Sequence, residues 1–347
     1  MDGRGLDAFL SVHPANVRYL TGFTGSSGFL LVGPEVAGLI TDFRYREQAA
    51  EEIPDDVPVW IHEEGWREEV GDRTAEVSGR GEVGFESDRL TVRDRDELAE
   101  AAPDVRWRGV TGLVEELRAR KSRDEVDRIR RAARLGDRVL ESFLGAVAEG
   151  ATEAELAAEL DYRLRLAGSE GVAFDTIVAA GPRSALPHAR PSDRPLAEGD
   201  LLLVDFGART GGYCSDMTRV FCLGPPAEWQ RSLHRSVLGA REAALEVIEP
   251  GVEASEVDAA ARRALERDGL EEHFGHSTGH GIGLEVHEGP SLSGRSEDRL
   301  RQGHVVTVEP AAYLEGRGGV RIEDDVAVGA DGPELLTRFP RELRELP

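Results

Sequence analysis

The sequence has little of several residue types, and each shortage narrows what the protein can be. Lys121 is the single lysine among 42 basic residues, and the excess of acidic residues gives a net charge of −24. A surface this acidic repels nucleic acid and anionic lipid, so we expect neither nucleic acid nor a membrane as a partner. In addition, no apolar run approaches the roughly 18 residues that a membrane helix needs.

Cysteine is also scarce, which excludes two structural classes. Cys214 and Cys222 are the only cysteines, and no CxxC pair is present. The chain therefore has neither a disulfide framework nor a cysteine-based zinc site. The first residues contain no long apolar stretch that would resemble a signal peptide, so we expect a cytoplasmic protein. At roughly 150 residues per domain, 347 residues favour two domains.

The first third of the chain alternates short apolar runs with helical patterns. The runs typical of strands are 8–12, 28–32, 36–41, 57–61 and 82–85, and the helical patterns are 44–52 and 93–102. Ser122 and Glu125 form a capping box that begins a long amphipathic helix. We therefore expect a smaller α/β domain over 1–118 and a second domain over 119–347.

The second domain contains two similar halves. GATEAELAAEL (150–160) resembles GVEASEVDAAA (251–261) at an offset of 101 residues, and LAEGDLLLVDFG (196–207) resembles LRQGHVVTVEPA (300–311) at an offset of 104. A repeat of this length is not a solenoid period. It predicts two halves packed about a pseudo-twofold axis, with equivalent strands facing one centre.

Four acidic residues follow or face the apolar strands of these halves. Asp205 ends the run LLLVD, and a hairpin centred between Thr210 and Gly211 would place Asp216 directly opposite it. Glu309 follows VVTV, and a hairpin centred on Gly316 would place Glu323 opposite it.

The pseudo-symmetry would bring these two pairs together. Carboxylates so placed repel one another unless protons or cations lie between them, so four convergent acids predict a site for two metal ions. The glycine-rich segment HSTGHGIGLEVHE contains His276, His280 and His287, one of which becomes a candidate ligand. Mixed oxygen and nitrogen ligands suit Mn, Co, Zn or Fe.

These motifs resemble those of a known family. VDFGARTGGYCSDMTR, HSTGHGIGLEVHE, TVEP and VRIED follow the order of the pita-bread metallopeptidases (M24), which include aminopeptidase P, prolidase and methionine aminopeptidase. The segment ITDFRYREQA is similar to the N-terminal domain of the Xaa-Pro branch and of creatinase. The resemblance implies an α+β protein: a C-terminal pita-bread (creatinase/aminopeptidase) fold with pseudo-twofold halves, preceded by a smaller creatinase-like α/β domain.

The resemblance also implies a complete set of metal ligands for two divalent ions. Asp205 would bind one ion, Asp216 and Glu323 would bridge both, and His280 and Glu309 would complete the other. Manganese is the expected metal, with cobalt, zinc or iron as alternatives. Creatinase has the fold but lacks this ligand set, which argues against a creatine-type activity.

Further roles are carried over from the family motifs. The implied catalytic residues are His188, His287 and Glu309, and the implied substrate-binding residues are His276, Tyr313 and Arg321. The implied activity is that of a dinuclear metal-dependent exopeptidase that cleaves the Xaa-Pro bond at the N-terminus of peptides or in dipeptides. The substrate would be a small peptide, and the family resemblance implies a homodimer.

Two other classes of function compete with this one. GHSTG (275–279) matches the G-x-S-x-G motif of serine hydrolases, with Ser277 as the nucleophile, and that motif requires a strand before it and a helix after it. Alternatively, the chain is a non-catalytic pita-bread protein that binds a partner through the same groove, a role for which the ligands would not be needed.

Overall fold

The computed structural model describes residues 4–63, 65–78 and 81–347, and these form two compact units, Met1–Glu116 and Leu117–Pro347. Each unit has its own clusters of buried apolar side chains. The first three residues of the domain expected over 1–118 lie outside the described part. Within the described part, no helix is both long enough and apolar enough to cross a membrane.

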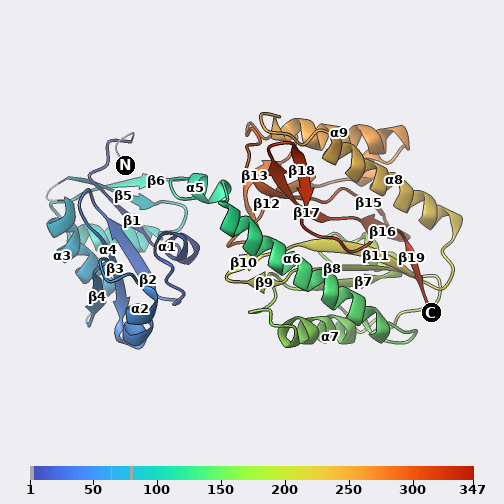
Figure 1. Ribbon diagram of the computed structural model, residues 1–347, viewed down its shortest axis with the longest axis horizontal. Coiled ribbons are helices and arrows are strands. Elements are labelled where there is room, and N and C mark those ends of the chain that lie inside the picture. Colours follow the sequence, from blue (N-terminus) through green and yellow to red (C-terminus); the bar gives the residue numbers. More distant parts are fainter. Residues whose placement is uncertain (1–3, 64, 79–80) are drawn as a thin grey trace. The chain divides into compact units, whose positions relative to one another are not determined.

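The first unit is a six-stranded mixed sheet with helices, in the strand order β4-β3-β2-β1-β5-β6 (Figure 1). Its strands are β1 (Ala8–Ser11), β2 (Gly28–Val32), β3 (Ala37–Asp42), β4 (Val59–His62), β5 (Glu82–Glu86) and β6 (Arg106–Val110). Its helices are α1 (Pro14–Thr21), α2 (Arg46–Glu52), α3 (Trp66–Ser78) and α4 (Val92–Ala101), and α5 (Glu115–Ala119) follows. The strands and helices predicted from the sequence are present, whereas α1, α3, α5 and β6 had not been predicted.

The second unit begins with the long helix that the capping box predicts. The Ser122 side chain accepts a hydrogen bond from the backbone N–H of Glu125, and the Glu125 carboxylate accepts one from the backbone N–H of Ser122. Helix α6 (Arg123–Phe143) starts at this cap and buries one apolar face. The other long helices of this unit are α7 (Glu153–Leu166), α8 (Glu228–Glu246) and α9 (Ala254–Arg267).

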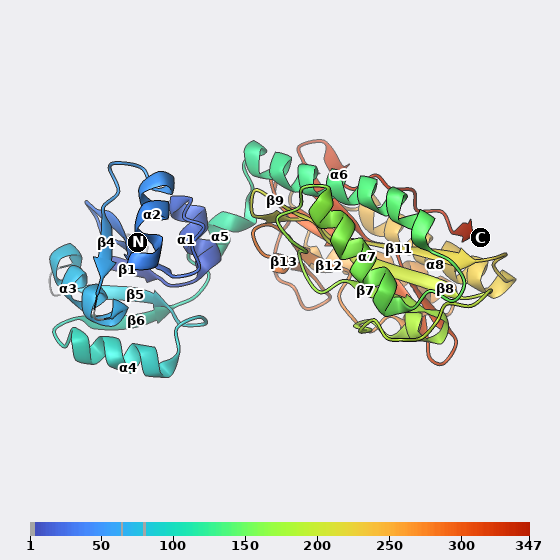
Figure 2. The same cartoon turned by 90° about the horizontal axis from the view of Figure 1, so that it is seen from below.

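The strands of the second unit form two main sheets that lie between the helix pair α6/α7 and the helix pair α8/α9 (Figures 1 and 2). One sheet has the order β19-β11-β8-β7, with β7 (Ile177–Ala180), β8 (Leu201–Phe206), β11 (Met217–Leu223) and β19 (Arg344–Leu346). The other has the order β13-β12-β14-β17-β18, with β12 (Gly279–Gly281), β13 (Glu288–Leu292), β14 (Val305–Val308), β17 (Asp324–Gly329) and β18 (Gly332–Leu335). Two short ribbons pair β9 (Arg209–Thr210) with β10 (Tyr213–Cys214) and β15 (Ala311–Leu314) with β16 (Gly318–Arg321).

The two halves repeat as the sequence predicts. Helices α7 and α9 begin and end at the same offset, since 254 − 153 and 267 − 166 are both 101. Strands β8 and β14 hold equivalent places, each central in its sheet and each ending at or beside a candidate acid. The internal duplication therefore produces two equivalent layers whose central strands present acids to one region.

One predicted hairpin register was wrong and the other is confirmed. Asp205 pairs with Thr218, not with Asp216, because the turn is centred between Gly211 and Gly212. Both glycines have positive φ, +59° and +83°. A centre one residue earlier would have forced the β-branched Thr210 into that region, which favours glycine. A two-residue shift keeps side chains on the same face of a strand, so the predicted face survives.

The second hairpin has the predicted register. Val308 pairs with Asp324, and Ala311 pairs with Arg321. Both pairings place Glu309 across from Glu323, and Gly316 lies in the turn with φ of +71°.

Candidate functional site

A cavity of about 330 Å³ in the second unit collects most of the predicted site residues. Nine of the ten line it: His188, Asp205, Asp216, His276, His280, His287, Glu309, Arg321 and Glu323. The tenth, Tyr313, does not line the cavity but contacts two residues that do. Its hydroxyl lies 2.7 Å from Arg321 Nη1 and 3.0 Å from His276 Nε2.

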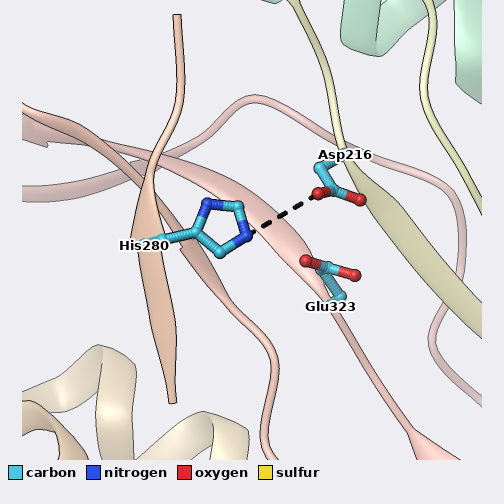
Figure 3. Close-up of side chains that lie close together, drawn as sticks. All are labelled: Asp216, His280 and Glu323. Carbon is cyan, nitrogen blue, oxygen red and sulfur yellow. Dashed lines mark ion pairs between the residues drawn. The ribbon is translucent and has the colours of Figure 1, made fainter. Parts of the chain in front are cut away.

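Three donors of this cavity lie close enough to share one ion. Asp216 precedes β11, His280 lies on β12 and Glu323 precedes β17, and one ligand atom from each lies within 4.8 Å of the others. Figure 3 shows the three side chains pointing toward one another. The distance from His280 Nε2 to Asp216 Oδ2 is 3.8 Å. Side chains from both halves therefore meet at one point.

Asp205 and Glu309 lie beside this group of three rather than within it. Glu309 Oε1 is 3.5 Å from His280 Nε2. Asp205 Oδ2 accepts a hydrogen bond of 2.6 Å from Arg321 Nη2. The Glu309 backbone N–H donates to Thr278 O at 2.7 Å, which fixes the end of β14 against the histidine segment.

Three carboxyl groups of the cavity, those of Asp216, Glu309 and Glu323, have raised pKa values. Burial raises the pKa of Asp216 and of Glu323 well above the usual range, and the charges of neighbouring acids raise both further. Burial likewise raises the pKa of Glu309 to about 7. Acids that are buried together cannot all be ionised without a compensating positive charge.

The histidine of this group presents a lone pair to the acids. His280 Nδ1 lies 3.0 Å from Gly281 O, and a carbonyl oxygen can only accept, so Nδ1 carries the hydrogen. Burial lowers the pKa of His280 to about 4, so the ring is neutral at pH 7. The bare Nε2 then faces carboxylate oxygens of Asp216 and Glu309, an arrangement of acceptors that a cation would relieve.

Unpartnered buried oxygens point to the same conclusion. Asp205 Oδ1 and Asp216 Oδ1 are both buried without a hydrogen-bond partner among the described residues. Buried polar atoms almost always have a partner. Oxygens without partners, clustered acids and an imidazole nitrogen that carries no hydrogen together form a donor set that suits divalent transition metals.

Arg321 and Thr218 link two candidate ligands, Asp205 and Glu323, through a chain of hydrogen bonds. The buried Arg321 donates to Asp205 Oδ2 and, through Nε, to Thr218 Oγ1 at 3.0 Å. Thr218 in turn donates to Glu323 Oε2 at 2.6 Å. Sequence reasoning missed Thr218, although its position two residues after Asp216, on the same strand face, is a signal that could have found it.

A second chain of hydrogen bonds has a fixed direction. His276 Nδ1 donates to Ser277 O at 2.8 Å, so Nε2 accepts from the Tyr313 hydroxyl, and that hydroxyl accepts from Arg321. Burial lowers the pKa of His276 to about 4, which keeps the ring neutral. The three side chains therefore form one oriented network beside Asp205.

The two remaining histidines lie at the exposed side of the cavity. His188 follows the 3-10 helix 181–185, and His287 directly precedes β13. The rings of His287 and His280 are 4.4 Å apart between centroids. The apolar side chains of Phe174, Ile177 and Val286, which sequence reasoning also missed, line the cavity.

The serine-hydrolase alternative is contradicted by the local structure. Ser277 lines the cavity, but its segment leads into strand β12 (Gly279–Gly281) instead of a helix. A nucleophile elbow requires a strand-to-helix turn. The G-x-S-x-G match is therefore incidental.

Comparisons with known proteins agree with this geometry. A model described as metallopeptidase family M24 matches residues 127–330, and one described as the creatinase/prolidase N-terminal domain matches residues 1–120. The chain is 37% identical to an Xaa-Pro dipeptidase of Pyrococcus horikoshii, over 99% of this chain and 96% of that protein.

Solved structures show the same similarity. An Xaa-Pro dipeptidase from Bacillus anthracis has a TM-score of 0.96 and 39% identity, with 99% of this chain and 96% of that chain covered. An X-Pro aminopeptidase from Thermotoga maritima has a TM-score of 0.92 and 38% identity, with 99% and 98% covered.

The chain belongs to metallopeptidase family M24. Its residues 1–120 match the creatinase/prolidase N-terminal domain, and it is similar over 99% of its length to an Xaa-Pro dipeptidase. The expected family and pita-bread fold are therefore confirmed, and the family implies divalent metal ions in the cavity.

Proposed function

We propose that this protein is a metal-dependent Xaa-Pro dipeptidase. The observation that carries the proposal is the convergence of acids from both halves on one imidazole, with donor atoms of Asp216, His280 and Glu323 within 4.8 Å of one another. The non-catalytic alternative would not need such a costly cluster, since buried like charges destabilise a fold that gains nothing from them.

The residues that would hold two divalent ions are those of the cavity. Asp205 would bind one ion, Asp216 and Glu323 would bridge both, and His280 and Glu309 would complete the other. Bound ions would supply an activated water nucleophile at neutral pH and would polarise the scissile carbonyl. The unpartnered oxygens of Asp205 and Asp216 support this assignment.

The chain's own groups would orient the peptide and move the proton. Glu309, whose Oε1 lies 3.5 Å from His280 Nε2, would pass a proton to the departing proline nitrogen. His287 and His188, on the exposed side of the cavity, would contact the peptide carbonyl and the proline side of the substrate. The hydrogen-bonded side chains of His276, Tyr313 and Arg321 would hold Asp205 in position and would contact the substrate on the side away from its proline.

The finer assignments follow the family. We propose manganese as the metal to test first, followed by cobalt, zinc and iron. We also propose a homodimer in the cytoplasm, with the catalytic machinery in 119–347 and a creatinase-like domain in 1–118. One of the similar proteins is an Xaa-Pro dipeptidase and another is an X-Pro aminopeptidase, so substrate length is the property to measure.

The deciding experiment compares two substrates on metal-reconstituted protein. Ala-Pro should be hydrolysed faster than Ala-Pro-Ala, and a chelator should abolish both activities until manganese is restored. Asp216→Asn should lose activity and bound metal, whereas Asp331→Asn, on an exposed turn, is the matched control. An Asp216→Asn enzyme with full activity and both ions would refute the assignment, and preference for the tripeptide would make the protein an aminopeptidase.

A further inference from the structure

The single lysine of this chain is buried beside the candidate site. Every other basic side chain is arginine, and the Lys121 side chain is only 1% exposed. Its Nζ donates to Glu288 Oε2 at 3.1 Å. Its backbone N–H donates to Gly303 O at 2.8 Å, and a Cβ at Gly303 would lie 2.8 Å from Lys121 O. The lysine is therefore held tightly at both its backbone and its charged end.

Glu288 is the centre of a small buried ion cluster. Its other oxygen, Oε1, accepts from Arg118 Nη2 and from the backbone N–H of Glu285 at 3.0 Å. Arg118 also reaches Glu285 Oε2 at 2.8 Å. Burial would raise the pKa of Glu288, but Lys121 and Arg118 hold it below its usual value. The carboxylate is therefore ionised and fixed from three directions.

This cluster holds the segment that carries His287. Residues 283–287 form bends between β12 and β13, and His287 immediately precedes Glu288. The Glu288 carboxylate folds back over the segment, where a Cβ at Gly283 would lie 2.6 Å from Oε2. An irregular segment depends on side-chain contacts of this kind for a fixed conformation.

We infer that Lys121 is a positioning residue for His287, acting through Glu288. The inference rests on the proposed function, in which His287 contacts the substrate. Lys121 does not itself line the cavity. Its task is to keep the 283–288 segment in one conformation, so that the exposed His287 ring stays 4.4 Å from the ring of His280.

The geometry also explains why this position retains lysine in an arginine-rich chain. Arg118 already occupies Oε1, so position 121 faces the one remaining oxygen of Glu288. An ammonium group brings three N–H donors to that oxygen, whereas a guanidinium would bury five in a fixed plane. Donors left unpaired in a buried site are unfavourable, so Lys121→Arg should not substitute for lysine here.

The first test measures hydrogen exchange on the metal-free protein. Lys121→Met and Lys121→Arg should both speed amide exchange of the 283–288 peptide by about tenfold or more while other core peptides stay unchanged. Arg194→Met is the matched control, because it breaks an ion pair of 2.8 Å with Asp200 in the other half. If Lys121→Met does not fold, Lys121→Met/Glu288→Gln removes the unpaired buried charge and serves in its place.

The second test is a mutant cycle on metal-loaded enzyme with an Xaa-Pro dipeptide. Lys121→Met should lower kcat/KM by about 10- to 100-fold with metal content unchanged, but should have almost no further effect in a His287→Ala background. Equal losses in both backgrounds, or unchanged exchange of 283–288, would overturn the inference. A His287→Ala enzyme with normal kcat/KM would also overturn it while leaving the proposed function intact. If the wild type hydrolyses no Xaa-Pro peptide, the proposed function fails, and the exchange test still decides whether Lys121 fixes the segment.

Discussion

Thr218 offers the sharpest single perturbation of the metal centre. Its hydroxyl accepts from Arg321 Nε at 3.0 Å and donates to Glu323 Oε2 at 2.6 Å, and the side chain is fully buried. Thr218→Val keeps the shape but removes both bonds. A guanidinium donor and a carboxylate oxygen are then buried without a partner.

The magnitude follows from the two groups left unpaired. Each buried group without a partner costs about 1–3 kcal/mol, so the metal-free protein should lose roughly 2–4 kcal/mol after relaxation. For a domain of this size that corresponds to a fall in Tm of about 4–16 °C. Because Thr218 orients Glu323, metal affinity should fall about 10- to 100-fold as well.

The assay combines calorimetry of the metal-free protein with metal titration. Thr218→Ser is the matched control, since it keeps the hydroxyl and loses one methyl group, and it should retain most of the stability and affinity. If Thr218→Val melted and bound metal like the wild type, Thr218 would not connect Arg321 with Glu323 in solution, and the reasoning would be refuted.

Three further predictions follow from the same geometry. Because Asp216, Glu309 and Glu323 have raised pKa values, metal binding should release protons and metal affinity should rise with pH. Titration calorimetry in buffers of different ionisation enthalpy should detect this proton release, and metal binding without proton release would contradict the prediction. Asp324 is fully buried against Arg219 and Arg241, which hold its pKa low despite its burial, so its contribution to stability is present above about pH 4 and is lost as pH falls further. Asp324→Asn should therefore lower the free energy of unfolding by about 3–5 kcal/mol at pH 7 and by less in acid. An equal loss at every pH would show that the charge of Asp324 does not stabilise the fold. Gly212→Ala should cost about 1–2 kcal/mol by denaturant unfolding because φ is +83° there, whereas Gly145→Ala, at negative φ with open space around it, should cost less.

Much of the candidate site could be predicted because its residues follow directly from strand patterns. The hairpin that pairs Glu309 with Glu323 has one glycine-rich turn, so alternation and symmetry fixed its register. The register predicted for the first hairpin was wrong because the turn sequence allows two centres, Thr210/Gly211 and Gly211/Gly212. Only the sign of φ at both central positions distinguishes them, and that requirement excludes Thr210 from the centre.

The elements that were not predicted depend on packing contacts between distant parts of the chain, and a local sequence pattern does not reveal such contacts. Helix α3 contains Gly71, which sequence rules treat as a helix breaker. In the structure this glycine is buried, and a Cβ there would lie 3.1 Å from Ala101 O of α4. The glycine thus permits a close approach of two helices. Thr218 was missed for a similar reason, since its importance arises from Arg321, 103 residues away in the chain.

The origin of the ligands in both duplicated halves has a consequence for synthesis. Asp216 precedes Glu323 by 107 residues, so the first acids leave the ribosome roughly 5–20 s before the last one. During that interval the β8–β11 hairpin carries its carboxylates without the arginine and imidazole that later surround them. The full candidate ligand set therefore does not exist until the second half has been made, and we expect tight metal binding only after that half has docked on the first.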